Sequence, residues 1–232
     1  MAYPVGHRDE VKQKIVASAR RLFNRHGFEN VSVDRIMSGA GLTRGGFYSY
    51  FESKSELYAE VLDCFFTNPE WKNCWEGVEI DPRLGEIGPQ VVRAYLSRQH
   101  FEDVENSCPM VALPGDVTRS GDEARQAFET VFKAMVSLLE RSLDDGPNRA
   151  GRNGNGRNGH VGKDAGKRHG GASRRKVGQA LAALCIGGMV VARALESRAL
   201  ADELRDACMQ VAFEMAGWPA CPANGKPVRA KR

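Results

Sequence analysis

The stretch GLTRGGFYSYFESKSEL, residues 41–57, places two adjacent glycines and a cluster of aromatic residues directly before a helix start. Ser53, with Glu56 three positions later, forms the capping box that opens a helix. Glycine inside a helix costs about 1 kcal/mol relative to alanine, so Gly45 and Gly46 need a reason. A helix surface without side chains lets another molecule approach closely, and a helix in the major groove of DNA needs this at its N-terminal turns. The stretch therefore predicts the recognition helix of a helix-turn-helix unit.

Two short helices are expected before this stretch. On the first, apolar residues recur on one face: Val11, Ile15, Ala19, Leu22 and Phe23. Gly27 supplies the left-handed residue that ends this helix, and Ser32 is a good N-cap for the second, which Gly41 ends. Thr43 can then cap a third helix, which finishes near Tyr50. Three short helices and the start of a longer one thus fit within the first roughly 60 residues, as in a compact helix-turn-helix domain.

The expected DNA contacts lie at the starts of these helices. Arg44 can bond a guanine edge in bidentate fashion, so we expect it to read a base. Lys54 adds a cation at the N-terminus of the fourth helix, where free backbone N–H groups already favour a phosphate. Phe47 and Phe51 lie four apart on one face and are expected in the core. The expected DNA-binding residues are Ser32, Thr43, Arg44, Gly45, Gly46, Tyr48, Tyr50 and Lys54.

The rest of the chain also reads as helical, so the fold class is all-α. No segment shows strand alternation, and helical patterns recur at residues 90–101, 123–143, 174–195 and 200–218. Residues 146–171 break the pattern with nine glycines and almost nothing apolar, and we expect a disordered insert there. The expected division is an N-terminal helix-turn-helix domain over residues 1–56 and a larger helical domain over residues 57–232.

Composition limits the possible partners and locations. Lysine and arginine number 33 against 29 aspartates and glutamates, too small a surplus to name a partner. The basic residues concentrate in residues 144–176, which hold nine of them against three aspartates. The N-terminus is charged where a secretory signal is apolar, and the longest apolar run, residues 180–192, is shorter than the about 20 residues that span a bilayer. We therefore expect a cytoplasmic protein without a membrane partner.

Catalytic and metal sites are not expected. The six cysteines lie far apart without a CxxC pair, so the sequence indicates neither a zinc site nor a disulfide framework. The five histidines are scattered, and no GxxxxGK[ST], HExxH or GxSxG motif occurs. The expectation is neither an enzyme nor a cofactor-binding protein.

The segment ARRLFNRHGFENVSVDRIMSGAGLTRGGFYSYFESKSELYAEVL, residues 19–62, resembles the DNA-binding unit of the TetR family of bacterial transcriptional repressors. One departure is Tyr50, where the family often has histidine, although a tyrosine hydroxyl can also meet a phosphate. The resemblance implies a homodimer whose two recognition helices enter successive major grooves of a palindromic double-stranded DNA operator. It also implies that the larger domain binds a small-molecule inducer and forms the dimer.

The last two helical segments carry apolar stripes. Their residues advance by steps of three and four, which forms a seam for packing another helix. In the TetR family the last two helices form a four-helix bundle across the dimer axis, so the resemblance implies an interface here. The expected interface residues are Leu181, Leu184, Gly188, Val191, Leu195, Leu204, Val211 and Met215.

The resemblance also implies an effector pocket among the middle helices. Most candidates to line it are aromatic, which indicates a largely apolar effector. The expected lining residues are Trp71, Trp75, Tyr95, His100, Phe101, Phe128, Phe132 and Met135.

Two other functions stay open from the sequence. Cys108 precedes Pro109, a residue suited to a first helical turn, so its thiol is expected at a helix N-terminus that stabilises a reactive thiolate. Some members of the family sense oxidants or electrophiles through a cysteine in this region, and the protein would then be a redox or electrophile sensor. Alternatively, the basic insert at residues 146–171 would make it a non-specific nucleic-acid binder with the helical body as a scaffold.

Overall fold

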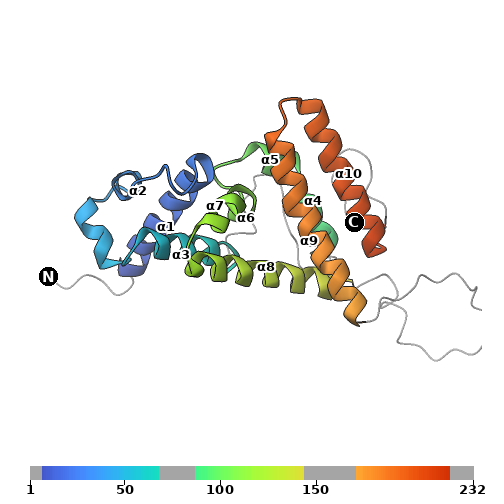
Figure 1. The fold of residues 1–232 in the computed structure, drawn as a ribbon, viewed down its shortest axis with the longest axis horizontal. Coiled ribbons are helices and arrows are strands. Elements are labelled where there is room, and N and C mark those ends of the chain that lie inside the picture. Colours follow the sequence, from blue (N-terminus) through green and yellow to red (C-terminus); the bar gives the residue numbers. More distant parts are fainter. Residues whose placement is uncertain (1–6, 68–86, 144–170, 220–232) are drawn as a thin grey trace, which may run out of the picture.

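The computed structural model describes residues 7–67, 87–143 and 171–219, and every regular element in these ranges is a helix (Figure 1). The expected all-α class is confirmed over this part of the chain. The effector candidates Trp71 and Trp75 lie outside the described residues. Residues 146–170 of the expected insert also lie outside them, whereas Gly171 already belongs to a helix.

Four helices form the N-terminal unit: α1 (His7–His26), α2 (Val33–Gly39), the 3-10 helix η1 (Arg44–Ser49) and α3 (Lys54–Thr67). Local signals set their ends. Gly27 and Gly41 adopt the left-handed conformation, with φ of 76° and 72°, and so allow the turns after α1 and α2. The Ser32 hydroxyl accepts the Arg35 N–H at 3.2 Å and caps α2, as predicted.

Within residues 87–143 and 171–219, seven helices follow: α4 (Ile87–Tyr95), α5 (Arg98–Glu102), α6 (Pro109–Ala112), α7 (Pro114–Arg119), α8 (Asp122–Ser142), α9 (Gly171–Ala194) and α10 (Arg198–Ala216). The single helix predicted at residues 90–101 is wrong, because the chain breaks there into α4 and α5. Ser97 takes an extended conformation between them, and its hydroxyl caps α5 by accepting the His100 N–H at 3.1 Å. The sequence patterns also missed the short helices α6 and α7.

Two hydrophobic cores hold these helices together. The first lies between α1, α2, η1 and α3, and Leu113, Val117 and Ala124 from later in the chain complete it. The second lies between α4, α8, α9 and α10. Phe128 on α8 packs against both cores, so this long helix joins the N-terminal unit to the remaining helices. The first core therefore extends beyond the expected boundary at residue 56.

Helix α9 carries a long apolar segment. Its segment Ser173–Ala194 is long and apolar enough to cross a membrane by length and composition, contrary to the expectation from residues 180–192. This segment packs against α8 and α10, and 44% of its most apolar window is buried inside the molecule. Such burial is what a core helix of this length requires.

Candidate nucleic-acid interface

The recognition element η1 is anchored by two phenylalanines. Phe47 and Phe51 are buried, with ring centroids 5.8 Å apart, as the sequence predicted. The element is a 3-10 helix and not the expected α-helix, and the hydroxyl of Thr43 makes no capping hydrogen bond at its start. Two consecutive glycines disfavour a regular α-helix in so short a segment, which explains the difference.

The outer side of η1 is open. Thr43, Arg44 and Gly45 are exposed, Tyr48 is 63% exposed, and Tyr50 is half-buried against the first core. A side chain at Gly45 would meet no atom within 4 Å, and one at Gly46 would meet only the Met37 methyl at 3.7 Å. Neither glycine has a positive φ. Neither the backbone nor the packing of the chain therefore requires glycine at these two positions.

Arg44 is held by an acidic side chain of the preceding helix. Its Nη1 lies 2.9 Å from Oδ2 of Asp34, in the first turn of α2. The two side chains are 63% and 56% exposed, so the pair lies on the surface. Among the described contacts, the Nε and Nη2 groups of Arg44 have no partner. Asp34 therefore orients one end of the guanidinium, while its Nε and Nη2 groups can still donate hydrogen bonds to another molecule.

Lys54 takes a different place from the one expected. Its Nζ donates hydrogen bonds to the carbonyl oxygens of Phe28 at 3.0 Å and Val31 at 3.1 Å, and lies 4.2 Å from the centre of the Phe28 ring. The side chain is half-buried. Its ammonium group holds the turn between α1 and α2, so the geometry favours a structural role over the expected contact with a DNA phosphate.

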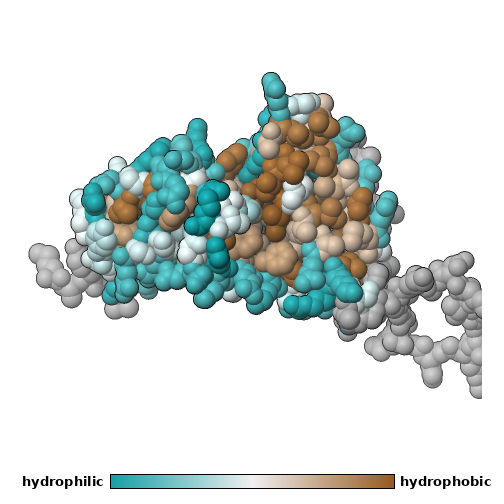
Figure 2. Space-filling model, viewed as in Figure 1, coloured by the Kyte–Doolittle hydropathy of each residue, from teal (hydrophilic) through white to brown (hydrophobic). Residues whose placement is uncertain are grey.

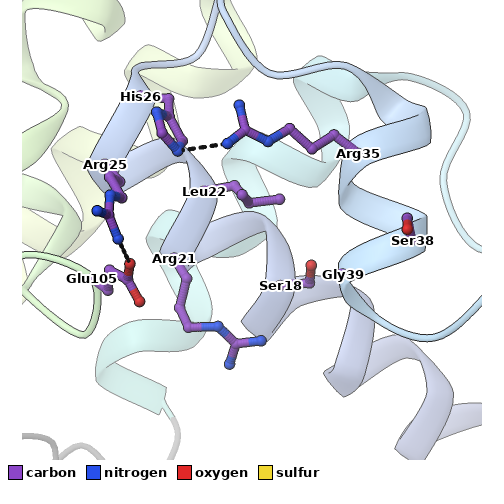
Figure 3. A pocket seen from close by; sticks show the side chains of 9 residues that line it. All are labelled: Ser18, Arg21, Leu22, Arg25, His26, Arg35, Ser38, Gly39 and Glu105. Atoms are coloured by element: carbon purple, nitrogen blue, oxygen red, sulfur yellow. Dashed lines mark hydrogen bonds and ion pairs between the residues drawn. The ribbon is translucent and has the colours of Figure 1, made fainter.

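A cleft of about 610 Å³ lies between α1 and α2 (Figure 3). Its lining is polar and mainly cationic: Ser18, Arg21, Leu22, Arg25, His26, Arg35, Ser38, Gly39 and Glu105. Arg35 reaches across the cleft to Nε2 of His26 at 2.8 Å, and Arg25 pairs with Glu105. Gly39 lets the helices meet, because a Cβ there would lie 2.5 Å from the Ser18 hydroxyl. The sequence analysis did not identify this cleft, although Arg21 and Arg25 lie four residues apart on one helix.

The loop before α6 ties the N-terminal unit to the rest of the molecule. The side-chain amide of Asn24 donates hydrogen bonds to the carbonyl oxygens of Ser107 at 2.9 Å and Glu105 at 3.1 Å. The backbone N–H of Phe28 donates to the Asp116 carboxylate at 2.8 Å. These contacts join residues about 80 positions apart, and the sequence analysis identified none of them.

His100 belongs to a buried polar network and is not exposed to a pocket. Its Nε2 accepts the backbone N–H of Cys108 at 3.3 Å, so its Nδ1 carries the proton and donates to the Tyr95 carbonyl at 2.6 Å. Burial, first of all, lowers the pKa of His100 from 6.5 to about 3, and the Arg193 charge lowers it further, whereas the bond to Tyr95 opposes the shift. The ring is therefore neutral near pH 7. Arg193 completes the network by donating to the Ser107 hydroxyl at 2.9 Å.

The other described effector candidates gather in the second core. Tyr95 and Met135 are buried, while Phe101, Phe128 and Phe132 are half-buried and pack against the same cluster. Burial and then the neighbouring Cys108 raise the pKa of Tyr95 well above its ordinary value. None of these residues lines the cleft between α1 and α2. They share one hydrophobic cluster, as an effector site requires.

Cys108 stands at the N-cap of α6 with Pro109 after it, as predicted. It is also fully buried, at 0% exposure. A thiol must meet solvent to react with an oxidant or electrophile, so this conformation does not favour the sensor hypothesis.

The predicted interface residues divide between two sides of α9 and α10. Leu181 and Gly188 are buried in the molecule's own core, which does not favour their assignment to an interface. Gly188 faces Cys208 and Leu96 of the same chain. The spacing of apolar residues in the sequence does not show which side of the helix faces the molecule's own core. The remaining predicted residues are half-buried or exposed: Leu184, Val191, Leu195, Leu204, Val211 and Met215.

An apolar face remains on α9 and α10 (Figure 2). Val191, Leu200 and Val211 are 50%, 48% and 43% exposed, large values for such side chains. Contiguous apolar surface of this kind marks an interaction site. We call these three residues and the exposed Gly187 and Ala207 the α9–α10 face.

Comparisons with known proteins agree with this geometry. Residues 15–61 match the sequence profile of "Bacterial regulatory proteins, tetR family". The chain is 32% identical over 153 residues to the uncharacterized HTH-type transcriptional regulator YfiR of Bacillus subtilis (strain 168), covering 60% of this chain and 69% of YfiR.

Solved structures share the fold at lower identity. The reduced form of E. coli NemR aligns with a TM-score of 0.63 at 17% identity, over 93% of this chain and 100% of NemR. A complex of SmeT with triclosan aligns with a TM-score of 0.56 at 20% identity, over 89% of this chain and 90% of SmeT.

Proposed function

The chain belongs to the TetR family of DNA-binding transcriptional regulators, and on this premise we propose that it is a cytoplasmic repressor. It binds a palindromic operator as a homodimer and leaves the operator when a small, largely apolar molecule binds the second core.

The observation that carries the proposal is the open surface of η1. Gly45 and Gly46 are not needed by the fold, yet they stand between Arg44 and the exposed Tyr48. An incoming DNA backbone explains their small size, because close approach is what an absent side chain permits. Arg44 would then reach base edges in the major groove, while Thr43 and Tyr48 would contact phosphates.

The α9–α10 face supports a homodimer. Apolar side chains as exposed as Val191 and Leu200 are stabilised when a second apolar surface covers them. A twofold axis through this face would cover each copy with the same surface of the other. Two copies of η1 would then meet two half-sites of a palindrome.

The second core and its polar network support release by an effector. Insertion of a ligand among Tyr95, Phe101 and Met135 requires these packed side chains to move apart. The loop that carries Ser107 adjoins this cluster through His100 and is bonded to Asn24 of α1. A displacement there would change the position of the N-terminal unit, provided that the ligand binds the displaced state more tightly. The triclosan complex of SmeT supports a small-molecule site in a fold of this kind.

Selection of duplexes from a random library, followed by affinity measurements in rising salt, tests the proposal. We expect one palindromic sequence to be enriched and its preference over random DNA to survive an increase in salt that weakens both. If no sequence is enriched and the affinity for every duplex depends only on the salt concentration, the proposal is contradicted. That result would favour the alternative of a non-specific nucleic-acid binder. Screening small apolar molecules for loss of operator binding then tests the effector.

A further inference from the structure

We propose that Asp34 determines specificity by positioning Arg44: its carboxylate orients the guanidinium that reads the operator and so favours DNA on which Arg44 finds a guanine. The inference rests on the proposed operator reading by Arg44. Asp34 is acidic, so a search for basic residues that contact DNA does not select it.

The contact between the two side chains leaves the reading edge of Arg44 open. Asp34 Oδ2 holds Nη1 at 2.9 Å. The opposite edge of the guanidinium, formed by Nη2 and Nε, has no partner among the described contacts and presents two parallel N–H donors. A guanine offers O6 and N7 in the matching arrangement. One guanidinium can therefore bond Asp34 and a guanine at the same time.

The ion pair is not needed to hold the fold. Both side chains are more than half exposed, and surface pairs of this kind contribute little to stability. Helix α2 and η1 are already joined by the turn at Gly41 and by the burial of Met37 and Phe47. A role in orientation accounts for the pair better than a role in stability does.

Orientation before binding strengthens the specific contact. A free arginine side chain samples many rotamers and loses this freedom when it binds a base. Asp34 restricts these rotamers in the unbound protein, so less freedom is lost on the operator.

The charge of Asp34 also acts on the DNA backbone. A carboxylate beside the recognition element repels phosphates, whatever the sequence. This repulsion lowers the affinity for the operator and for random DNA alike, so it cancels in the ratio of the two affinities. Specificity is the difference between the two binding free energies, and Asp34 raises it through the oriented Arg44 contact, which forms only where the guanine is present.

A double-mutant cycle in the full-length protein tests the proposal. The variants are Asp34→Ala, Arg44→Ala and the pair together. Each is measured on the duplex selected by the unmodified protein, on the same duplex with the guanine replaced, and on random DNA. Asp34→Asn retains an oxygen acceptor without charge, and Glu29→Ala removes an exposed carboxylate elsewhere in the same unit. Thermal unfolding of every variant reports on the fold.

We expect Asp34→Ala to tighten binding to random DNA and to lower the operator-to-random ratio about tenfold. In the Arg44→Ala background, Asp34→Ala should no longer change the preference for the duplex that carries the guanine. Glu29→Ala should leave this preference unchanged, with Arg44 present or absent. Asp34→Asn should retain part of the preference. An unchanged ratio for Asp34→Ala, or strictly additive effects in the cycle, would overturn the proposal. Failure of the unmodified protein to select any operator would instead overturn the proposed function, because Asp34 would then have no specificity to determine.

Discussion

The ammonium group of Lys54 lies over the ring of Phe28, 4.2 Å from its centre, and donates a hydrogen bond to the carbonyl oxygen of the same residue at 3.0 Å. A second bond reaches the carbonyl of Val31 at 3.1 Å. The first residue of α3 thus closes the turn between α1 and α2.

Replacement of Lys54 by methionine should therefore destabilise the fold. The change removes two hydrogen bonds from a charged donor and leaves two half-buried carbonyls without that partner, so we expect a loss of about 1–3 kcal/mol in the free energy of unfolding. Urea denaturation measures it. Lys12→Met is the control, because Lys12 pairs with Glu60 near the surface and should matter by less than about 1 kcal/mol. An unchanged stability together with a weaker salt dependence of DNA binding would instead support the phosphate contact predicted from the sequence.

Gly45→Val should separate DNA binding from folding. The new side chain meets no atom of the protein within 4 Å of its Cβ, so the melting temperature should change little. The same side chain stands where the DNA backbone is proposed to approach, and we expect at least a roughly tenfold loss of operator affinity. Gly121→Val is the control, because this exposed glycine at the N-cap of α8 also has no atom within 4 Å of an added Cβ. Full operator affinity in Gly45→Val would remove the main support for the proposed use of η1.

Local signals in the sequence predicted the helix ends well. The left-handed Gly27 and Gly41 and the Ser32 cap depend on residues only a few positions away, and the structure confirms all three. Helices α6 and α7 were missed because a helix of four or six residues is too short to show a period. Tertiary packing against α1, α3 and α8 supports them instead.

The partners of the site residues could not be predicted, because they lie far apart in the sequence. Lys54 reaches back 26 positions to Phe28, and Arg25 pairs with Glu105 across 80 positions. The apolar seam of α9 was visible, but periodicity alone does not say which residues face the molecule's own core. Packing against α10 decides that Gly188 faces inward while Val191 faces solvent.

His100 should make stability fall in acid. Its pKa is about 3 in the folded protein and 6.5 when free, so the unfolded chain takes up a proton below pH 6.5 that the folded protein refuses until about pH 3. Stability is therefore fully present above pH 6.5 and decreases below it, at about 1.4 kcal/mol per pH unit from this residue. His100→Gln should be less stable at pH 7 but should lose this part of the slope. Urea denaturation between pH 7 and pH 4 measures the difference, and parallel curves for the two proteins would contradict it.

Two adjacent glycines of α9 should respond in opposite ways to alanine. A Cβ at Gly188 would lie 2.8 Å from the Cys208 sulfur and 3.2 Å from its Cβ, so Gly188→Ala should cost about 1–3 kcal/mol. A Cβ at Gly187 meets nothing within 4 Å in the same chain, and alanine is the better helix former by up to about 1 kcal/mol. Gly187→Ala should therefore fold at least as stably as the unmodified protein. Thermal unfolding of the two variants side by side measures the contrast, and equal losses would mean that Gly187 is also enclosed.

Val191→Glu should separate the two subunits of the proposed dimer. Val191 is 50% exposed on the α9–α10 face, and a carboxylate there would be buried against apolar side chains of a partner. Burial of an unpaired charge is costly, so we expect the dimer dissociation constant to rise at least about 100-fold, while the melting temperature of the isolated chain changes little. Sedimentation over a range of protein concentrations measures the dissociation constant. Gln179→Glu adds the same charge to α9 about 120° around the helix and should leave the dimer intact.

Since operator binding needs both half-sites, Val191→Glu should also bind the full palindrome hardly better than a single half-site. A Val191→Glu protein that stays dimeric at the original concentration would place the interface elsewhere and leave the apolar face to another partner.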